Sequence, residues 1–208
     1  MNYEKVDIEN WSRKQQFEFF LKFTEPFFGI TFDLTITNFF NKTKERGDSI
    51  FIGYIFNILK AMNEIDELKM RIVGREVFRY NQIGCSATIA RDDGTFGFSY
   101  IDYNPNYKDF KISAEEEINR VQKSKSFDPG PQVYDTIHFS SLPWIKFTSL
   151  SHARQFDHPD SIPKVSCGKI VEKDGEYFMP FSIHVHHALV DGFHIGLLEK
   201  RLSELFNR

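Results

Sequence analysis

The chain has 208 residues and a formal net charge of -3, with 41% hydrophobic and 26% charged residues. This composition is typical of a globular protein, and its charge excludes a general attraction to nucleic acid. The two cysteines, Cys85 and Cys167, form no Cys-x-x-Cys pair, so we expect a reduced compartment and no disulfide framework. No apolar run reaches the length of a membrane span and no signal-peptide pattern precedes Tyr3, so we expect a cytoplasmic protein without a membrane partner.

Apolar residues at helical or alternating spacing predict the elements of the first half of the chain. Ser12 and Thr37 are expected to cap two helices, because their hydroxyl oxygens can accept hydrogen bonds from free backbone N–H groups. A third helix is expected to begin at Asp48 or Ser49. The predicted elements are a helix over 13–23, a strand over 28–36, helices over 37–47 and 49–62, a hairpin over 69–80, and strands over 85–90 and 96–101.

The second half of the chain shows the same kinds of pattern. Ser113 is expected to cap a polar helix, and the segment from Lys173 to Gly175 is expected to turn a hairpin. The predicted elements are a helix over 112–123, a loop over 126–131, a strand over 134–140 with 145–149 as its extension, a hairpin over 164–187 and a helix over 193–205. The whole pattern predicts an α+β fold: residues 1–208 form a single domain, a two-layer sandwich with helices packed on a mixed β-sheet.

The strongest functional signal is a strand that ends in histidines. Polar and apolar residues alternate over 181–186, which predicts a half-buried strand. His187 stands at its end, four residues before Asp191 and Gly192. A strand holds the imidazole in place, and a glycine turn lets the chain return close to it. A neutral imidazole can take a proton from a hydroxyl at neutral pH, so this arrangement is typical of base chemistry. A buried histidine with a structural role is the alternative.

The neighbouring histidines raise the question of a zinc site. Alternation sends His184 and His186 to one face of the strand and His187 to the other, and no fourth nitrogen or sulfur ligand lies at a useful spacing. We therefore expect no metal. A serine hydrolase that uses Ser140 with His187 is a further alternative, but Ser140 lacks the glycine pattern of a nucleophile elbow.

The segment 186–194 resembles the active-site segment of the chloramphenicol acetyltransferases, and its core, His-x-x-x-Asp-Gly, recurs in CoA-dependent acyltransferases. Segments 2–20, 63–70 and 140–144 are similar to the same family, and only 84–131 matches weakly. The resemblance implies the CoA-dependent acyltransferase fold, acetyl-CoA as co-substrate, and a homotrimer with three active sites at subunit interfaces. The 23 phenylalanines are compatible with such interfaces.

The resemblance also implies roles for four residues. His187 is the general base. Asp191 pairs with Arg13 of the first helix and so holds the turn that carries the base. Ser140, which precedes Leu-Pro-Trp at a strand end, donates a hydrogen bond to the oxyanion of the tetrahedral intermediate. From the residues alone, Asp191 as a solvated turn residue and Ser140 as a turn cap are the alternatives.

Departures from the family pattern fall in the expected acceptor pocket. Phe20 stands where the family has a tyrosine, His152 replaces a leucine, and Ser166 replaces a threonine that positions a water. The expected apolar walls are Leu150, Phe96 and Phe98.

No glycine-rich loop is present to bind the phosphates of CoA, so individual side chains are expected to do so. Ser49 stands where the family often carries a lysine, which removes one such contact. The residues expected to bind CoA are Trp144, Lys146 and Lys169.

The expected function is acetyl transfer from acetyl-CoA to a hydroxyl of chloramphenicol or a similar small acceptor. The oxygen attacks the thioester directly in a ternary complex, since no serine or cysteine nucleophile is paired with the base. A non-catalytic trimeric binder of small molecules with the same fold is the alternative.

Overall fold

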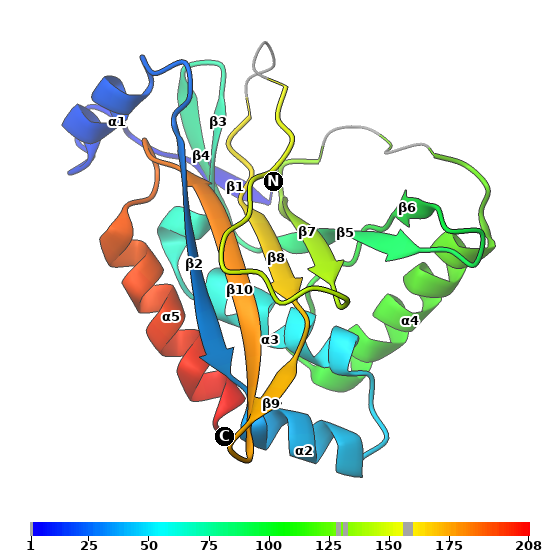
Figure 1. The fold of residues 1–208 in the computed structure, drawn as a ribbon. Coiled ribbons are helices and arrows are strands. Elements are labelled where there is room, and N and C mark those ends of the chain that lie inside the picture. Colours follow the sequence, from blue (N-terminus) through cyan, green and yellow to red (C-terminus); the bar gives the residue numbers. More distant parts are fainter. Residues whose placement is uncertain (1, 128–129, 131–132, 156–159) are drawn as a thin grey trace.

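The computed structural model of the chain describes residues 2–127, 130, 133–155 and 160–208 (Figure 1). Within them the strands form one seven-stranded and one three-stranded sheet. In chain order the elements are β1 (Tyr3–Lys5), α1 (Lys14–Phe20), β2 (Phe27–Thr35), α2 (Thr37–Glu45), α3 (Ile50–Asn63), the 3-10 helix η1 (Asp66–Lys69), β3 (Met70–Val73), β4 (Glu76–Tyr80), β5 (Gly84–Ala90), β6 (Phe96–Phe98), α4 (Tyr107–Lys123), β7 (Thr136–Leu142), β8 (Lys164–Gly168), β9 (Val171–Lys173), β10 (Glu176–His186) and α5 (Gly192–Phe206).

The large sheet has the strand order β2-β10-β8-β7-β5-β6, and β9 pairs with β10 outside this order. β10 is antiparallel to both β2 and β8, whereas β7 is parallel to β8 and to β5. The sheet is therefore mixed, as the sequence predicts. Between β9 and β10, Asp174 and Gly175 have φ angles of 55° and 83°. Positive φ at both central residues favours Asp-Gly and matches the twist of a hairpin, which explains the turn predicted there.

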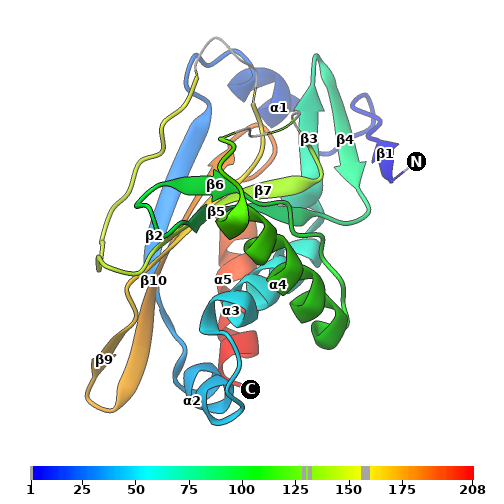
Figure 2. The same cartoon turned by 90° about the vertical axis from the view of Figure 1, so that its right-hand side faces the viewer.

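Helices cover one face of the large sheet (Figures 1 and 2). α3 is apolar along most of its length because it packs against the sheet and against α5, and its residues Ile55, Ile58 and Leu59 are buried. The segment that joins β7 to β8 passes over β8 and β10 on the other face (Figure 1). The α+β class, with helices packed on a mixed sheet, is thus confirmed. In the described part of the chain, no helix combines the length and the apolar character that crossing a membrane requires.

The small sheet consists of β1, β4 and β3. The hairpin of β3 and β4 was predicted, whereas the three residues of β1 are all exposed and carry no alternation that would reveal a strand. Arg71 of β3 is fully buried and ties this sheet to the large one. Its guanidinium donates hydrogen bonds of 2.7–2.9 Å to the carbonyl oxygens of Leu68, Met70, Tyr134 and Thr136. These four acceptors offset the cost of burying the guanidinium.

Three of the predicted helix caps are wrong. Ile36, and not Thr37, occupies the N-cap of α2, and the Thr37 hydroxyl accepts a hydrogen bond of 2.8 Å from the N–H of Tyr177 in β10 instead. Arg13, and not Ser12, occupies the N-cap of α1, which no side chain caps. α4 begins at Tyr107, earlier than predicted, because the side chain of Asn106 accepts a hydrogen bond from a backbone N–H of its first turn. Ser113 therefore lies inside α4 and donates its hydroxyl to a carbonyl of the preceding turn.

Some predicted boundaries differ from the structure as well. α1 ends at Phe20, before the predicted position 23. Residues 145–149 form no strand, because the N–H of Ile145 turns back to the carbonyl of Leu142 at 3.2 Å. In the loop predicted over 126–131, residues 128–129 and 131 lie outside the described residues.

Candidate active site

Polar residues line the face of the large sheet that the helices leave uncovered. Residues opposite each other on paired strands share a face of the sheet. One row in this register, across four strands, consists of Thr31, Ser182, Ser166 and Ser140. The next row consists of Gly29, His184, Lys164, His138 and Ser86. Ser141 faces the opposite way, since its Oγ lies 2.9 Å from the hydroxyl of Tyr54 in α3.

His187 follows the last residue of β10, and two aromatic rings hold its side chain. Its imidazole stacks on Phe20 of α1, with ring centroids 3.9 Å apart and planes 8° apart, and Phe28 of β2 packs against it at 4.5 Å. The backbone N–H of His187 donates to the carbonyl of Pro26 at 2.8 Å. Nδ1 of the ring is buried and has no hydrogen-bond partner among the described residues. Ring stacking and the backbone therefore orient this imidazole.

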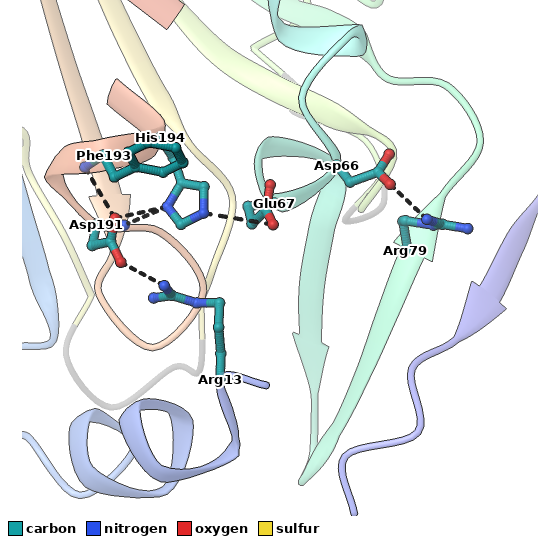
Figure 3. Close-up of polar contacts among 7 residues, drawn as sticks. All are labelled: Arg13, Asp66, Glu67, Arg79, Asp191, Phe193 and His194. Atoms are coloured by element: carbon teal, nitrogen blue, oxygen red, sulfur yellow. Dashed lines mark hydrogen bonds and ion pairs between the residues drawn. The ribbon is translucent and has the colours of Figure 1, made fainter. Parts of the chain in front are cut away.

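Asp191 joins the turn after His187 to three other elements (Figure 3). Its Oδ2 accepts a hydrogen bond of 2.5 Å from Nη1 of Arg13, so the structure contains the pair that the sequence predicts. Its Oδ1 accepts from the backbone N–H of Phe193 at 3.0 Å and thereby caps α5. Nδ1 of His194 lies 3.1 Å from the backbone nitrogen of Asp191, and Nε2 lies 3.5 Å from Oε1 of Glu67 in η1.

The electrostatics of this turn keep Asp191 ionised. Burial alone would raise the pKa of Asp191, but the hydrogen bond from Arg13 and the charges of His194 and Arg13 outweigh burial and lower the pKa. The carboxylate bonds to Arg13 and to α5, not to His187. Asp191 therefore positions the turn and is not the third member of a Ser-His-Asp triad.

Two adjoining cavities, of about 340 and 380 Å³, open beside Ser140. Both are lined by Thr88, Ser140, His152 and Ala153. The first also includes Ser86, Phe98, Tyr100, His138, Phe139 and Lys164. The second also includes Ala90, Phe96, Ser141, Leu142, Trp144, Leu150, Ser151 and Ser166. The structure thus brings together every predicted acceptor residue except Phe20, which lies against His187 in its own chain.

The cavity walls are more polar than the sequence predicts. Nζ of Lys164 is almost fully buried, pairs with the carboxylate of Asp160 and lies 3.3 Å from the carbonyl of Ile162. Burial lowers the pKa of Lys164, and it lowers the pKa of His152 to about 4. His138 was missed although it lies two residues before Ser140, where strand alternation puts both on one face. Lys164 was missed because only the strand order brings β8 beside β7.

Of the three residues expected to bind CoA, Trp144 alone lines the second cavity and its rim. Trp144 lines that cavity and is 74% exposed. The backbone N–H of Lys169 donates to the carbonyl of Ile145 at 2.9 Å, which holds it close to this rim. Lys146 is exposed and lies 3.6 Å from a carboxylate oxygen of Asp33. An exposed indole and two exposed ammonium groups suit a nucleotide thioester that enters beside Ser140.

Metal-ligating side chains do not gather anywhere in the part of the chain that the structure describes: no group of three or more His, Cys, Asp or Glu is arranged to hold an ion. Ser49 caps α3 by accepting a hydrogen bond of 3.3 Å from the N–H of Ile52, so its hydroxyl oxygen has a structural role there.

His187 and Ser140, the residues expected as base and oxyanion donor, are far apart within one chain. Ser182 and Ser140 are two strand spacings apart in register, which is roughly 10 Å. His187 lies five residues beyond Ser182 along the chain of β10, which adds roughly 16 Å in the perpendicular direction. The resulting separation of about 19 Å is too large for both groups to contact one reacting centre.

Comparison with known proteins agrees with this description. A family model described as chloramphenicol acetyltransferase matches residues 1–203. The chain belongs to the chloramphenicol acetyltransferase family. Chloramphenicol acetyltransferase 3 of Escherichia coli is 28% identical over 100% of this chain and 98% of its own length. The chloramphenicol acetyltransferase of Bacillus pumilus is 29% identical over 93% of this chain and 89% of its own length.

Solved structures show the same fold. A chloramphenicol acetyltransferase superimposes with a TM-score of 0.90 at 28% identity and covers 98% of this chain and 99% of that one. A probable dihydrolipoamide acetyltransferase from Listeria monocytogenes has a TM-score of 0.67 at 15% identity, covering 93% of this chain and 89% of that one, and shares the fold alone.

Proposed function

We propose that the protein transfers the acetyl group of acetyl-CoA to a hydroxyl of chloramphenicol or a similar small acceptor. Membership of the chloramphenicol acetyltransferase family supports this reaction. The observation that carries the proposal is the presence in each chain of two half-sites, a clamped imidazole just after the end of β10 and a cavity with the Ser140 hydroxyl beside β7. Neither half-site is complete alone.

In the proposed mechanism, His187 takes the proton of the acceptor hydroxyl as that oxygen attacks the thioester carbonyl. The hydroxyl of Ser140 donates a hydrogen bond to the oxyanion that forms, and this donor supplies about 10²–10³ in rate. Collapse of the tetrahedral intermediate breaks the carbon–sulfur bond, and the CoA thiolate receives the proton that His187 holds. Asp191 and Arg13 take no proton and keep the turn after His187 in place.

We infer a homotrimer in which His187 of one copy faces the Ser140 cavity of the next. The separation of about 19 Å within a chain supports a shared site. An exposed aromatic cluster beside the base, formed by Phe19, Phe20 and Phe23 with ring centroids 5.1–5.2 Å apart, supports an interface there. Phe19 is 57% exposed and Phe23 45% exposed, which is unfavourable for a surface that meets only water. A shared site also brings Phe20 to the acceptor.

Subunit complementation tests both the reaction and the shared site. Release of the CoA thiol is measured with chloramphenicol as acceptor. His187→Ala alone should lose about 10²–10⁴ of the rate, the contribution of a positioned base. Ser140→Ala alone should lose about 10²–10³. When the two variants are co-expressed at equal levels and assemble at random, about a quarter of all sites join an intact base to an intact serine, so activity should return to about that fraction of wild type.

The matched control is the double variant Ser140→Ala, His187→Ala co-expressed with wild type. It should also give about a quarter of full activity, because one ordered pair in four consists of two wild-type copies. Equal recovery in both mixtures supports the shared site. If the mixture of single variants stays at the level of either variant alone, base and serine act within one chain. If wild type releases no thiol with any hydroxylated acceptor, the protein is the non-catalytic binder.

A further inference from the structure

The cavity beside Ser140 contains hydrogen-bonding atoms that the chain itself leaves unpaired. Nε2 of His152 and Oγ of Ser166 are buried, and neither has a hydrogen-bond partner among the described residues. His152 lines both cavities and Ser166 lines the second. Buried polar atoms are nearly always paired in native proteins, and unpaired ones that face a cavity indicate a ligand that pairs them.

A third polar group, Lys164, lines the first of these cavities. Its ammonium donates to the carboxylate of Asp160 and to the carbonyl of Ile162, and Nζ also lies 5.1 Å from the centroid of the Phe27 ring, so these groups surround it. The carboxylate of Asp160 balances the charge of Lys164, so a second negative charge on a ligand is not required. The cavity therefore favours a ligand with hydrogen-bonding groups over an ion.

The protonation state of His152 agrees with a neutral ligand. Burial lowers the pKa of His152 to about 4, so its imidazole is neutral at pH 7. A neutral imidazole offers one donor and one acceptor, as a hydroxyl group does. His184 packs edge-on against the ring of His152, with centroids 5.0 Å apart, and fixes its plane.

Aromatic rings form the remaining walls. Phe98 and Tyr100 line the first cavity and Phe96 the second, and Phe96 and Phe98 pack edge-on with centroids 5.7 Å apart. Flat apolar faces opposite hydrogen-bonding side chains suit a ring that carries carbon-bound hydrogens on one side and hydroxyl groups around its edge.

We propose that the preferred acceptor is a neutral molecule with several hydroxyl groups, of the sugar or polyol class, and that chloramphenicol is a poor acceptor. This inference rests on the acetyl transfer proposed above. One hydroxyl of the acceptor forms the ester bond as the thioester bond breaks, and its proton passes through His187 to the CoA thiolate, while Ser140 donates a hydrogen bond to the oxyanion. Other hydroxyls of the same molecule pair His152 Nε2 and Ser166 Oγ.

A panel of acceptors at a fixed acetyl-CoA concentration tests the proposal by thiol release. The panel contains methyl α-glucoside, phenyl β-glucoside, xylitol and sorbitol as neutral polyols, glucuronic acid as an anionic one, glucosamine as a cationic one, and chloramphenicol. We expect kcat/KM for the best neutral polyol to exceed that for chloramphenicol by at least about tenfold, which corresponds to about 1.4 kcal/mol in transition-state binding. A higher value for chloramphenicol than for every neutral polyol overturns the proposal, and so does a higher value for glucuronic acid or glucosamine.

Two variants test the polar side chains that line the cavities, His152 and Lys164. His152→Leu should raise kcat/KM for chloramphenicol about tenfold and lower that for the best neutral polyol by a similar factor. Lys164→Met combined with Asp160→Asn should act in the same direction without leaving an unpaired buried charge. Lys108→Met, on the exposed surface of α4, is the matched control and should change neither value.

The two proposals fail in different ways. Thiol release with chloramphenicol that exceeds release with all polyols overturns the acceptor class and leaves acetyl transfer intact. Absence of thiol release with all seven acceptors, while calorimetry shows acetyl-CoA binding, overturns acetyl transfer and the acceptor class together. Unchanged acceptor preference in His152→Leu also overturns the acceptor class, because the unpaired Nε2 of His152 is its main support.

Discussion

At the scale of single residues, the candidate base and its neighbouring aspartate have separate tasks. His187 is oriented by the stacked ring of Phe20 and by the hydrogen bond from its own backbone N–H to Pro26. The carboxylate of Asp191 accepts hydrogen bonds from Arg13 and from the first turn of α5. The carboxylate of Asp191 forms no hydrogen bond with the imidazole of His187. Replacing Asp191 should therefore destabilise the turn, and His187 should still act as the general base of the proposed reaction.

Arg13 and Asp191 should therefore depend on each other in a double-mutant cycle. Their pair is partly buried, with side chains 13% and 33% exposed, so each single change to Ala should cost about 1–3 kcal/mol of unfolding free energy, between the values for surface and buried pairs. The double variant should cost clearly less than the sum, because both changes remove one interaction. Urea unfolding measures the three costs. Strict additivity would contradict the pairing.

The same pair should depend on pH in a defined direction. The pKa of Asp191 lies below its ordinary value of 3.8 in the folded protein, so its stabilising contribution is present above pH 3.8 and is lost as pH falls through the lower folded value. Asp191→Asn should lower stability by a constant amount at neutral pH. The gap between variant and wild type should close as the pH falls below 3.8, and a gap that persists to the lowest measurable pH would show that the charge of Asp191 is not what Arg13 requires.

At the scale of elements, local pattern predicts the parts of the fold that are long and regular. β10, α3 and α5 were predicted to within about two residues of their ends, because the two helices carry a helical period over more than ten residues and β10 alternates over 181–186 after a recognisable turn. β1 was missed because its three side chains are all exposed and show no alternation. Its side-chain contacts, such as the ion pair of Glu4 with Arg79 and the ring contact of Tyr3 with Phe78, form only once β1 lies beside β4. The start of α4 was missed because the cap is predicted at Ser113, although Asn106 is a favoured N-cap residue and the first turn already contains the buried Phe110.

The residues of the candidate site also fall into two groups, those that the sequence predicts and those that it misses. The motif residues of the turn after β10 follow from sequence, because they lie within a few positions of one another. The polar wall formed by His138, His152 and Lys164 comes from three separate segments, and only the order β10-β8-β7 and the path of the connecting segment bring them together. Sequence spacing carries no information on that order.

Packing between β2 and β10 makes one glycine necessary. A Cβ at Gly29 would lie 2.3 Å from Nε2 of His184, whose ring covers the backbone of the neighbouring strand. Gly29→Ala should therefore cost about 1–3 kcal/mol of unfolding free energy through overpacking. Adding His184→Ala should remove most of that cost. Gly196→Ala, where nothing lies within 4 Å, is the matched control and should gain about 0.5–1 kcal/mol in the exposed helix α5.

At the scale of the whole molecule, the two proposed half-sites lie at different places on the large sheet. The cavity lies over β5, β7 and β8, where parallel pairing aligns Ser140 with Ser166. The base lies at the far end of β10 beside α1. Since strand geometry keeps these regions roughly 19 Å apart, no side-chain movement within a chain can join them, and assembly becomes a condition of the proposed chemistry.

Disruption of the aromatic cluster beside the base should therefore abolish activity without touching either half-site. Phe19 is 57% exposed and packs against Phe20 and Phe23 without contacting His187, so Phe19→Asp should leave each chain folded while introducing a charge into the proposed interface. We expect sedimentation velocity to show monomers and thiol release to fall by at least about 10²-fold, the loss that follows when the base is absent from the reacting centre. Ile112→Asp, at a 49% exposed position on α4, changes an apolar surface residue in the same way on the helical side and should keep both the assembly and the rate. A monomeric Phe19→Asp variant with wild-type turnover would show that one chain holds a complete site, and the inference of a shared site would have to be abandoned.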